Sequence, residues 1–243
     1  MSTGRRSDPA AEHPPWSAGE ACAAVLGARI VLIISSVVVF GIGGWTSGAI
    51  PPWGQLLALI PYWLAALEVS RRFWARSGRS PIRWLVADEP ALRQAMQVAV
   101  GVIAGLVTSL LLVPALYAPL HQWWGTTPDD LEGPARLLVE QANGPGGVAA
   151  LVLMTCVGAP VVEEVLYRGV LQPGLARLGT VASIMVSSAV FAAIHLQPLQ
   201  FAGLLLIGVV LALLRWWSDG LAAPIAAHVA FNAVTVVVLL AQR

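Results

Sequence analysis

Residues 147–166, GVAALVLMTCVGAPVVEEVL, form an apolar stretch that ends close to two adjacent glutamates, Glu163 and Glu164. A helix needs about 20 predominantly apolar residues to cross a bilayer. An ionised side chain at membrane depth costs several kcal/mol, roughly 2.5 or more on insertion scales. The stretch therefore predicts a membrane-spanning helix, and the glutamate pair predicts a chemical role inside the membrane.

The composition of the whole chain also indicates a membrane protein. Of 243 residues, 57% are hydrophobic and 11% are charged, and the mean hydropathy is +0.75. A soluble domain carries about 25% charged residues. The apolar blocks are separated by short polar or Pro/Gly segments, which is typical of polytopic helical membrane proteins. We expect an all-α transmembrane helical bundle of seven to eight spans, near 22–43, 52–69, 94–117, 147–166, 180–196, 200–217 and 221–241.

The segment 166–178 is interrupted by glycine, proline and arginine, and the sequence leaves open a continued helix, a break or an interfacial segment. The polar residues 1–19 are expected to form a disordered tail, without a cleavable signal peptide. We expect transmembrane helices and loops over 20–145 and a catalytic transmembrane core over 146–243. Cys22 and Cys156 lie in apolar blocks and are expected to be small buried side chains without redox or metal function.

Arginines in one short loop predict how the chain is oriented in the membrane. The loop 70–93 is rich in arginine, whereas 118–146 is mainly acidic. Positive charge favours the cytoplasmic side, so we expect the cytoplasmic membrane, with the amino terminus inside. A topology signal is a simpler explanation of the arginines than a nucleic-acid-binding patch, and no nucleic-acid partner is expected. In 118–146, Trp123, Trp124 and Pro128 predict an interfacial anchor, with gating of access as the alternative.

Several known kinds of intramembrane protease do not fit the sequence. All basic residues are arginines, so a serine-lysine dyad is absent. The nearest approach to a GxSG serine motif, 44-GWTSG-48, has the wrong spacing, and the zinc motif HExxH does not occur. The few aspartates lie in predicted tails or loops, which argues against aspartyl proteolysis.

A small polar set remains in the carboxy-terminal spans: Glu163, Glu164, Arg168, His195, His228 and Asn232. Residues four apart share a helix face, which pairs Glu164 with Arg168, His228 with Asn232, and Phe191 with His195. Glu163 is rotated by about 100° from Glu164. We therefore predict a structural ion pair for Glu164 and a free proton acceptor in Glu163. A single histidine is more often structural, but two histidines and a free glutamate at membrane depth favour a shared aqueous site.

The spacing allows two of these residues to meet. Glu163 and His195 are each 16 residues from Gly179, so a turn there between antiparallel helices puts both about 24 Å from the turn. His228 follows the 218–220 turn closely and would lie at another depth. A break near 197–200, or a tilted and short sixth span, would reconcile the three.

The motifs EExxxR (Glu163, Glu164, Arg168), FxxxH (Phe191, His195) and HxxxN (His228, Asn232), in this order on successive apolar helices, resemble the CPBP family of intramembrane endopeptidases, the CAAX protease and bacteriocin-processing or Abi family. The resemblance covers about 160–233. It implies a CAAX-protease-like helical fold in a multi-pass integral membrane protein.

The resemblance also implies a reaction. A peptide bond of a membrane-associated substrate, such as a prenylated CAAX protein or a leader-type peptide, would be hydrolysed by water. Glu163 and His195 would activate the water, and His228 and Asn232 would form an oxyanion hole. Supporting roles fall to Glu164, Arg168 and Phe191.

A required cofactor is not expected, although the family has also been described as metalloproteases. If zinc were bound, Glu163, His195 and His228 would be its ligands, but this would leave Asn232, a poor zinc ligand, without a role. Two other classes of protein use similar residues. A membrane transporter or channel would use them as a proton or metal-ion relay, and a pseudoenzyme would bind a membrane partner without cutting it. The two halves of the chain lack the similarity of an inverted repeat, which argues against transport.

Overall fold

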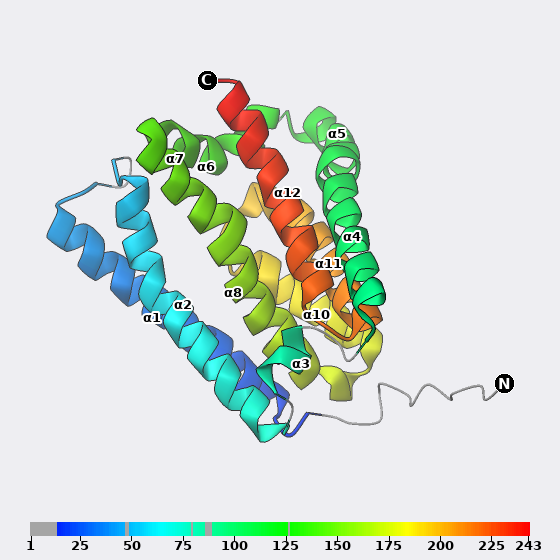
Figure 1. Cartoon of the computed structure of the whole chain (residues 1–243). Helices are drawn as coiled ribbons and strands as arrows, with labels where there is room; N and C mark the ends of the chain where they lie inside the picture. The colour runs from blue at the N-terminus through cyan, green and yellow to red at the C-terminus, as the bar shows by residue number, and fades with distance from the viewer. Residues whose placement is uncertain (1–13, 47–48, 79, 86–88, 126) are drawn as a thin grey trace.

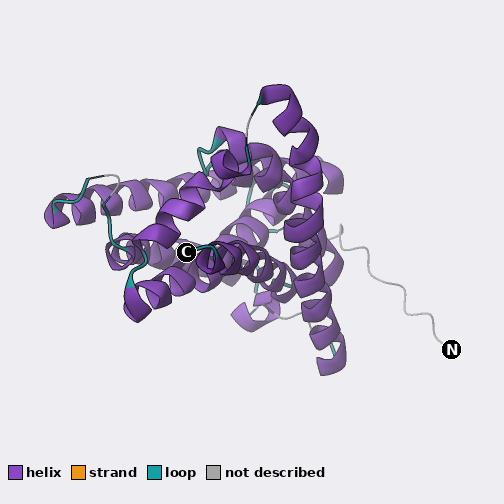
Figure 2. Ribbon diagram, turned by 90° about the horizontal axis from the view of Figure 1, so that it is seen from above, coloured by secondary structure: helices purple, strands orange, loops and turns teal. Residues whose placement is uncertain are grey.

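The computed structural model describes residues 14–243, except 47–48, 79, 86–88 and 126. The described residues form helices and loops, with no strand among them (Figure 2). The α-helices are α1 (Ala18–Gly43), α2 (Pro52–Arg76), α3 (Pro81–Leu85), α4 (Ala91–Val107), α5 (Val113–Trp124), α6 (Pro128–Gln141), α7 (Gly144–Val152), α8 (Ala159–Leu166), α9 (Gln172–Gly174), α10 (Thr180–Ala193), α11 (Phe201–Ser218) and α12 (Ala222–Ala241). The predicted all-α class is confirmed.

Three π-helical turns connect several of these helices without a break in direction: η1 (Thr108–Leu112), η2 (Leu153–Gly158) and η3 (Tyr167–Leu171). As a result, Gly144–Gly174 is one long helical stretch. Most of the segment 166–178 thus continues the fourth predicted helix. It ends in a 3₁₀ turn over Ala176–Leu178 and a positive φ of 89° at Gly179, a conformation that glycine adopts at little cost.

Five stretches of the described chain are long and apolar enough to cross a membrane: Ala18–Gly43, Ala91–Trp123, Gly144–Gly174, Pro198–Ser218 and Ala222–Ala241. The chain is an integral membrane protein of helical type. The expected count of seven to eight spans is not reproduced by this measure. The apolar helix α10 has 14 residues, or about 21 Å, which is shorter than a hydrocarbon core of about 30 Å. Helix α2 is also absent from the five, and its last turns carry Glu68, Arg71 and Arg72.

Figure 1 shows how the helices surround the long stretch that contains α8. Helices α1 and α2 pack together on one side of it, and α12 lies on the other side against α4. The α4–α12 packing is close because Gly101 and Gly105 face the backbone of α12. A Cβ atom at these positions would overlap the carbonyl oxygens of Ala223 and Ala227, respectively. Small residues four apart commonly allow such an approach between membrane helices.

The amino-terminal boundary differs from the expected one. Residues 1–13 of the predicted tail lie outside the described residues, but α1 begins at Ala18 with a capping box from Ser17 and Glu20. Trp16 is buried, and its indole N–H donates to the carbonyl of Val170 at 3.1 Å. The described end of the predicted tail is therefore packed onto the carboxy-terminal core.

The two predicted loops also contain helix. Helix α2 extends through Arg76, and α3 follows it, although residues 79 and 86–88 of the arginine-rich loop lie outside the described residues. The predicted loop 118–146 includes the end of α5 and all of α6. Thr127 caps α6, and the Thr127 backbone N–H, by donating to Asp130, holds the pKa of that carboxyl below its usual value. Trp123 is 75% exposed, whereas the side chains of Trp124 and Pro128 lie outside the described part.

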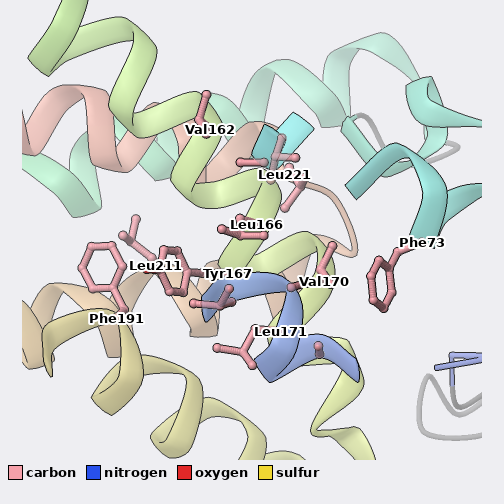
Figure 3. Packing of buried hydrophobic residues seen from close by; sticks show 14 of the residues in the cluster. Phe73, Val162, Leu166, Tyr167, Val170, Leu171, Phe191, Leu211 and Leu221 are labelled. Carbon is pink, nitrogen blue, oxygen red and sulfur yellow. The ribbon is translucent and has the colours of Figure 1, made fainter. Parts of the chain in front are cut away.

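The main core lies around η3. Leu166, Tyr167, Val170 and Leu171 are completely buried, and Figure 3 shows them between the ring of Phe191 and that of Phe73. This packing surrounds the polar residues of α8 and η3 with apolar side chains.

Candidate active site

Glu164 is the centre of a buried network between three helical stretches. Its Oε1 lies 3.2 Å from Nη1 of Arg168 and 3.0 Å from Nδ1 of His228. Arg168 also donates from Nη2 to the carbonyl of Gly208 on α11 at 3.0 Å. Glu164 and Arg168 have no exposed surface. The expected Glu164–Arg168 pair is present, and it is extended to α12 by His228, which the sequence did not indicate.

Glu163 has a different environment. Its Oε2 lies 4.0 Å from Nε2 of His195 and 4.0 Å from Nε2 of His228. These distances are too long for direct hydrogen bonds and suit a bridge by one small polar molecule such as water. The structure therefore brings together three of the residues predicted from sequence, with Glu163 8% and His228 5% exposed.

The other ring nitrogen of each histidine has an acceptor partner. Nδ1 of His195 lies 2.7 Å from the carbonyl oxygen of Phe191, and Nδ1 of His228 faces the Glu164 carboxylate. Each Nδ1 therefore carries a proton and donates it, because neither partner can donate when Glu164 is ionised. In neutral imidazoles this assignment leaves both Nε2 lone pairs directed towards Glu163.

Phe191 holds the aromatic and cationic groups of the site in place. Its ring centroid lies 4.8 Å from that of His195 and 5.8 Å from that of His228, and Cζ of Arg168 is 4.5 Å from it. Tyr167 packs edge-on against the same ring at 5.4 Å (Figure 3). The FxxxH spacing thus supplies a ring that contacts both histidines and the guanidinium, which favours a cation–π interaction.

The break after α10 explains how His195 and His228 reach the same carboxylate. Helix α10 ends at Ala193, Leu196 has a positive φ of 55°, and a 3₁₀ turn covers Pro198–Gln200. Tyr117 fixes this connection, because its hydroxyl donates to the carbonyl of Leu199 and accepts from the N–H of Gly203. The structure thus adopts the first of the two arrangements that would reconcile the depths of these residues.

Asn232 forms a hydrogen bond with a residue other than Glu163. Its Nδ2 donates to the carbonyl of Thr155 in η2 at 2.8 Å, and no hydrogen bond to Glu163 or His195 is found among the described residues. Asn232 and Thr155 instead line a mainly apolar cavity of about 620 Å³ between α5, α6, α11 and α12. Asn232 thus lines this cavity from α12, the helix that also carries His228.

Three residues near Glu163 were missed in the sequence. Arg29 from α1, Tyr62 from α2 and Tyr167 from η3 interact electrostatically with Glu163. One signal was present for Arg29, which is the sole charged residue between Glu20 and Glu68 in the sequence. The two tyrosines gave no signal, because tyrosine is common in apolar helices and their approach depends on how α1, α2 and η3 pack.

The zinc alternative was tested on the arrangement of the donors. Among the described residues, no group of three or more His, Cys, Asp or Glu side chains is arranged to hold a metal ion. Nδ1 of His228 is engaged by Glu164, and both Nε2 atoms are 4.0 Å from Glu163 Oε2. Oε2 of Glu163 and Nε2 of each histidine are the donor atoms that zinc would use.

The fold and this site define the class of protein: a helical membrane protein with a buried glutamate and two histidines at one point. Residues 145–234 match the family model described as type II CAAX prenyl endopeptidase Rce1-like. This match is consistent with the CPBP family, so the resemblance seen in the motifs is confirmed, and it supports CAAX-type intramembrane endopeptidase activity in general. No curated protein and no solved structure matched the chain. The matched segment contains every motif residue but neither Arg29 nor Tyr62.

Proposed function

We propose that this protein is an intramembrane endopeptidase that hydrolyses a peptide bond of a membrane-associated substrate with Glu163 as general base. The observation that carries the proposal is the equal 4.0 Å distance from Glu163 Oε2 to the Nε2 atoms of His195 and His228. One water molecule between these atoms would donate its two O–H groups to Oε2 of Glu163 and Nε2 of His195, with Nε2 of His228 beside it. The roles proposed for His195, His228 and Asn232 follow from the hydrogen-bond partners of each side chain.

The reaction begins with the water held by Glu163 and His195. Glu163 accepts a proton from the water while the water oxygen forms a bond to the carbonyl carbon of the scissile peptide. His195 orients the water through Nε2, because Nδ1 is fixed by Phe191. Collapse of the tetrahedral intermediate breaks the C–N bond, and the proton on Glu163 passes to the leaving nitrogen.

Oxyanion stabilisation is assigned to His228 and Asn232. His228 donates from Nε2 when both of its ring nitrogens carry a proton. Asn232 has two amide N–H groups, of which one is used by Thr155 and the other is available to the substrate. Residues 146–243 would therefore be the catalytic core, with 20–145 as the helices that surround it.

The cavity beside Asn232 is proposed to receive the apolar part of the substrate. Its volume of about 620 Å³ and its mainly apolar lining suit a hydrocarbon chain, so a prenylated protein or peptide is the substrate class that we propose. The arginine-rich segment 70–93 supports a cytoplasmic-membrane location with the amino terminus inside.

The test is cleavage of lipidated and unlipidated reporter peptides by the purified protein in lipid vesicles. Wild type should cleave, and Glu163→Gln should lose activity by about 10²- to 10⁴-fold while keeping the thermal unfolding temperature of the wild type. Activity that persists with a zinc chelator supports the metal-independent mechanism. Loss with chelator and rescue by zinc would assign Glu163, His195 and His228 to a metal site. Glutamate-dependent ion flux without cleavage would instead indicate a transporter.

A further inference from the structure

Arg29 places a positive charge within the apolar sequence of α1. It is the only charged residue after Glu20 in that helix, which is long and apolar enough to cross a membrane. Charged residues at such depth are costly, and they generally pair with another group or take part in function. Within the described part of the chain, no carboxylate comes within 4.0 Å of the Arg29 guanidinium.

The surroundings of Arg29 are rich in unused donors. Its Cζ lies 5.5 Å from the ring centroid of Tyr62. Tyr62 is 2% exposed and Tyr167 is fully buried. The hydroxyls of both tyrosines and Nε of Arg29 are buried without a hydrogen-bond partner among the described residues. Buried polar groups nearly always have a partner. The Arg29 guanidinium interacts with the Tyr167 hydroxyl oxygen, which leaves the O–H groups of Tyr62 and Tyr167 and Nε–H of Arg29 without an acceptor. These donors from α1, α2 and η3 therefore indicate an acceptor supplied by another molecule.

The chemistry of these donors selects the kind of acceptor. A guanidinium binds carboxylates through parallel hydrogen bonds, and phenol hydroxyls donate to the same oxygens. Arg29 is partly exposed, whereas Tyr62 and Tyr167 are buried, so a ligand would enter beside Arg29. The Tyr167 ring packs against Phe191 at 5.4 Å, and Phe191 contacts the rings of His195 and His228. The cluster therefore adjoins the proposed catalytic site, and all three residues interact electrostatically with Glu163. The charge of Arg29 offsets the repulsion that Glu163 would exert on a second anion.

We propose that Arg29, Tyr62 and Tyr167 form a subsite for a carboxylate group of the peptide substrate. The inference rests on the proposed function, because it assigns a substrate group to the same site. The carboxylate belongs to the free carboxy terminus of the peptide or to an acidic side chain, since both present the same pair of oxygens.

The experiment compares three peptides of one sequence with the full-length protein in lipid vesicles. One peptide ends in a free carboxylate, one in a carboxamide, and one in a carboxamide with an aspartate as its last residue. Wild type should prefer one of the carboxylate peptides to the plain carboxamide by about 10- to 100-fold in kcat/KM, the range for hydrogen bonds to charged groups. Whether the first or the third peptide is preferred identifies the source of the carboxylate.

Variants then test whether Arg29 and Tyr62 cause the preference for carboxylate peptides. Arg29→Gln should reduce the carboxylate-to-carboxamide ratio to about one, mainly through KM, and Arg29→Lys should restore part of it. Tyr62→Phe should lower the ratio by a smaller factor. The matched control is Arg72→Gln, which removes an exposed arginine paired with Glu68 and should leave the ratio unchanged. Equal cleavage of all peptides by wild type, or equal slowing of all peptides by Arg29→Gln, would overturn the subsite.

Binding to Glu163→Gln protein separates the subsite from the proposed reaction. Fluorescently labelled versions of the three peptides should bind with the same order of preference, and Glu163→Gln/Arg29→Gln should lose it. Preference in binding without cleavage by wild type would overturn the protease proposal and retain the carboxylate subsite. Equal binding of all peptides, or no binding, would overturn the subsite whatever the cleavage result.

Discussion

Nδ1 of His228 lies 3.0 Å from Oε1 of Glu164, and this contact joins α12 to the long helical stretch that contains α8. Arg168 approaches the same oxygen at 3.2 Å and also reaches α11 through Gly208. One buried carboxylate thus orders three helical stretches. Because Nδ1 of His228 is occupied, its Nε2 is directed to Glu163, and the structural role of Glu164 sets the orientation of a proposed catalytic residue.

Glu164→Gln should therefore destabilise the protein strongly. The substitution keeps the size of the side chain but leaves the buried Arg168 without a counter-ion, and breaking a buried ion pair in this way costs about 3–5 kcal/mol. Thermal unfolding in detergent would measure the loss. Glu164→Gln/Arg168→Met should recover part of it, because no uncompensated charge stays buried. A single variant as stable as wild type would show that the pair contributes little.

His195→Asn should separate the role of Nδ1 of His195 from that of Nε2. The asparagine amide can retain the hydrogen bond from the position of Nδ1 to the Phe191 carbonyl, but it removes Nε2, which faces Glu163. Cleavage should fall by about 10²- to 10⁴-fold, the usual contribution of a general acid–base group, with little change in unfolding temperature. Activity near that of wild type would remove His195 from the proposed mechanism.

Gly105→Ala should loosen the packing between α4 and α12. The new methyl group would overlap the backbone carbonyl of Ala227, next to His228, and overpacking typically costs about 1–3 kcal/mol. Unfolding temperature and peptide cleavage should both decrease. The control is Gly27→Ala in α1, where a Cβ meets no atom within 4 Å. It should be neutral or slightly stabilising, because alanine favours helix over glycine.

Trp74→Phe should weaken the support of η3. The indole N–H of Trp74 donates to the carbonyl of Gly169 at 3.0 Å, and its loss leaves a buried acceptor unpaired at a cost of about 1–3 kcal/mol. Trp63→Phe is the control, because the Trp63 indole N–H has no hydrogen-bond partner among the described residues. Equal unfolding temperatures for the two variants in detergent would contradict a role for the Gly169 contact.

The membrane class and the helix-local relationships were predictable from the sequence. Apolar block length depends on the thickness of the bilayer, so most helices were located closely, as for 200–217 against Phe201–Ser218. The i, i+4 rule predicted that Glu164 meets Arg168 and that Phe191 meets His195, since neighbours on one helix face need no knowledge of the fold. The same rule did not reveal that His228 and Asn232 bond to different partners, Glu164 and Thr155.

The helices inside the predicted loops and the packing of the predicted tail were missed for a related reason. Helix α6 is amphipathic rather than apolar, and Trp16 is buried only because Val170 and its neighbours approach from a distant part of the chain. Hydropathy detects contact with lipid, whereas these segments are stabilised by caps and by protein contacts.

By itself, the sequence determined the helical membrane class, the family motifs and the set of polar residues available for chemistry, because these depend on composition and on spacing along single helices. Only the tertiary structure decided which atoms meet. The contact of His228 with Glu164, the equal distances of two histidines from Glu163, and the approach of Arg29 and Tyr62 each join helices far apart in the chain. Such distances depend on helix packing, on π-helical turns and on the break after α10, which local residue patterns do not encode.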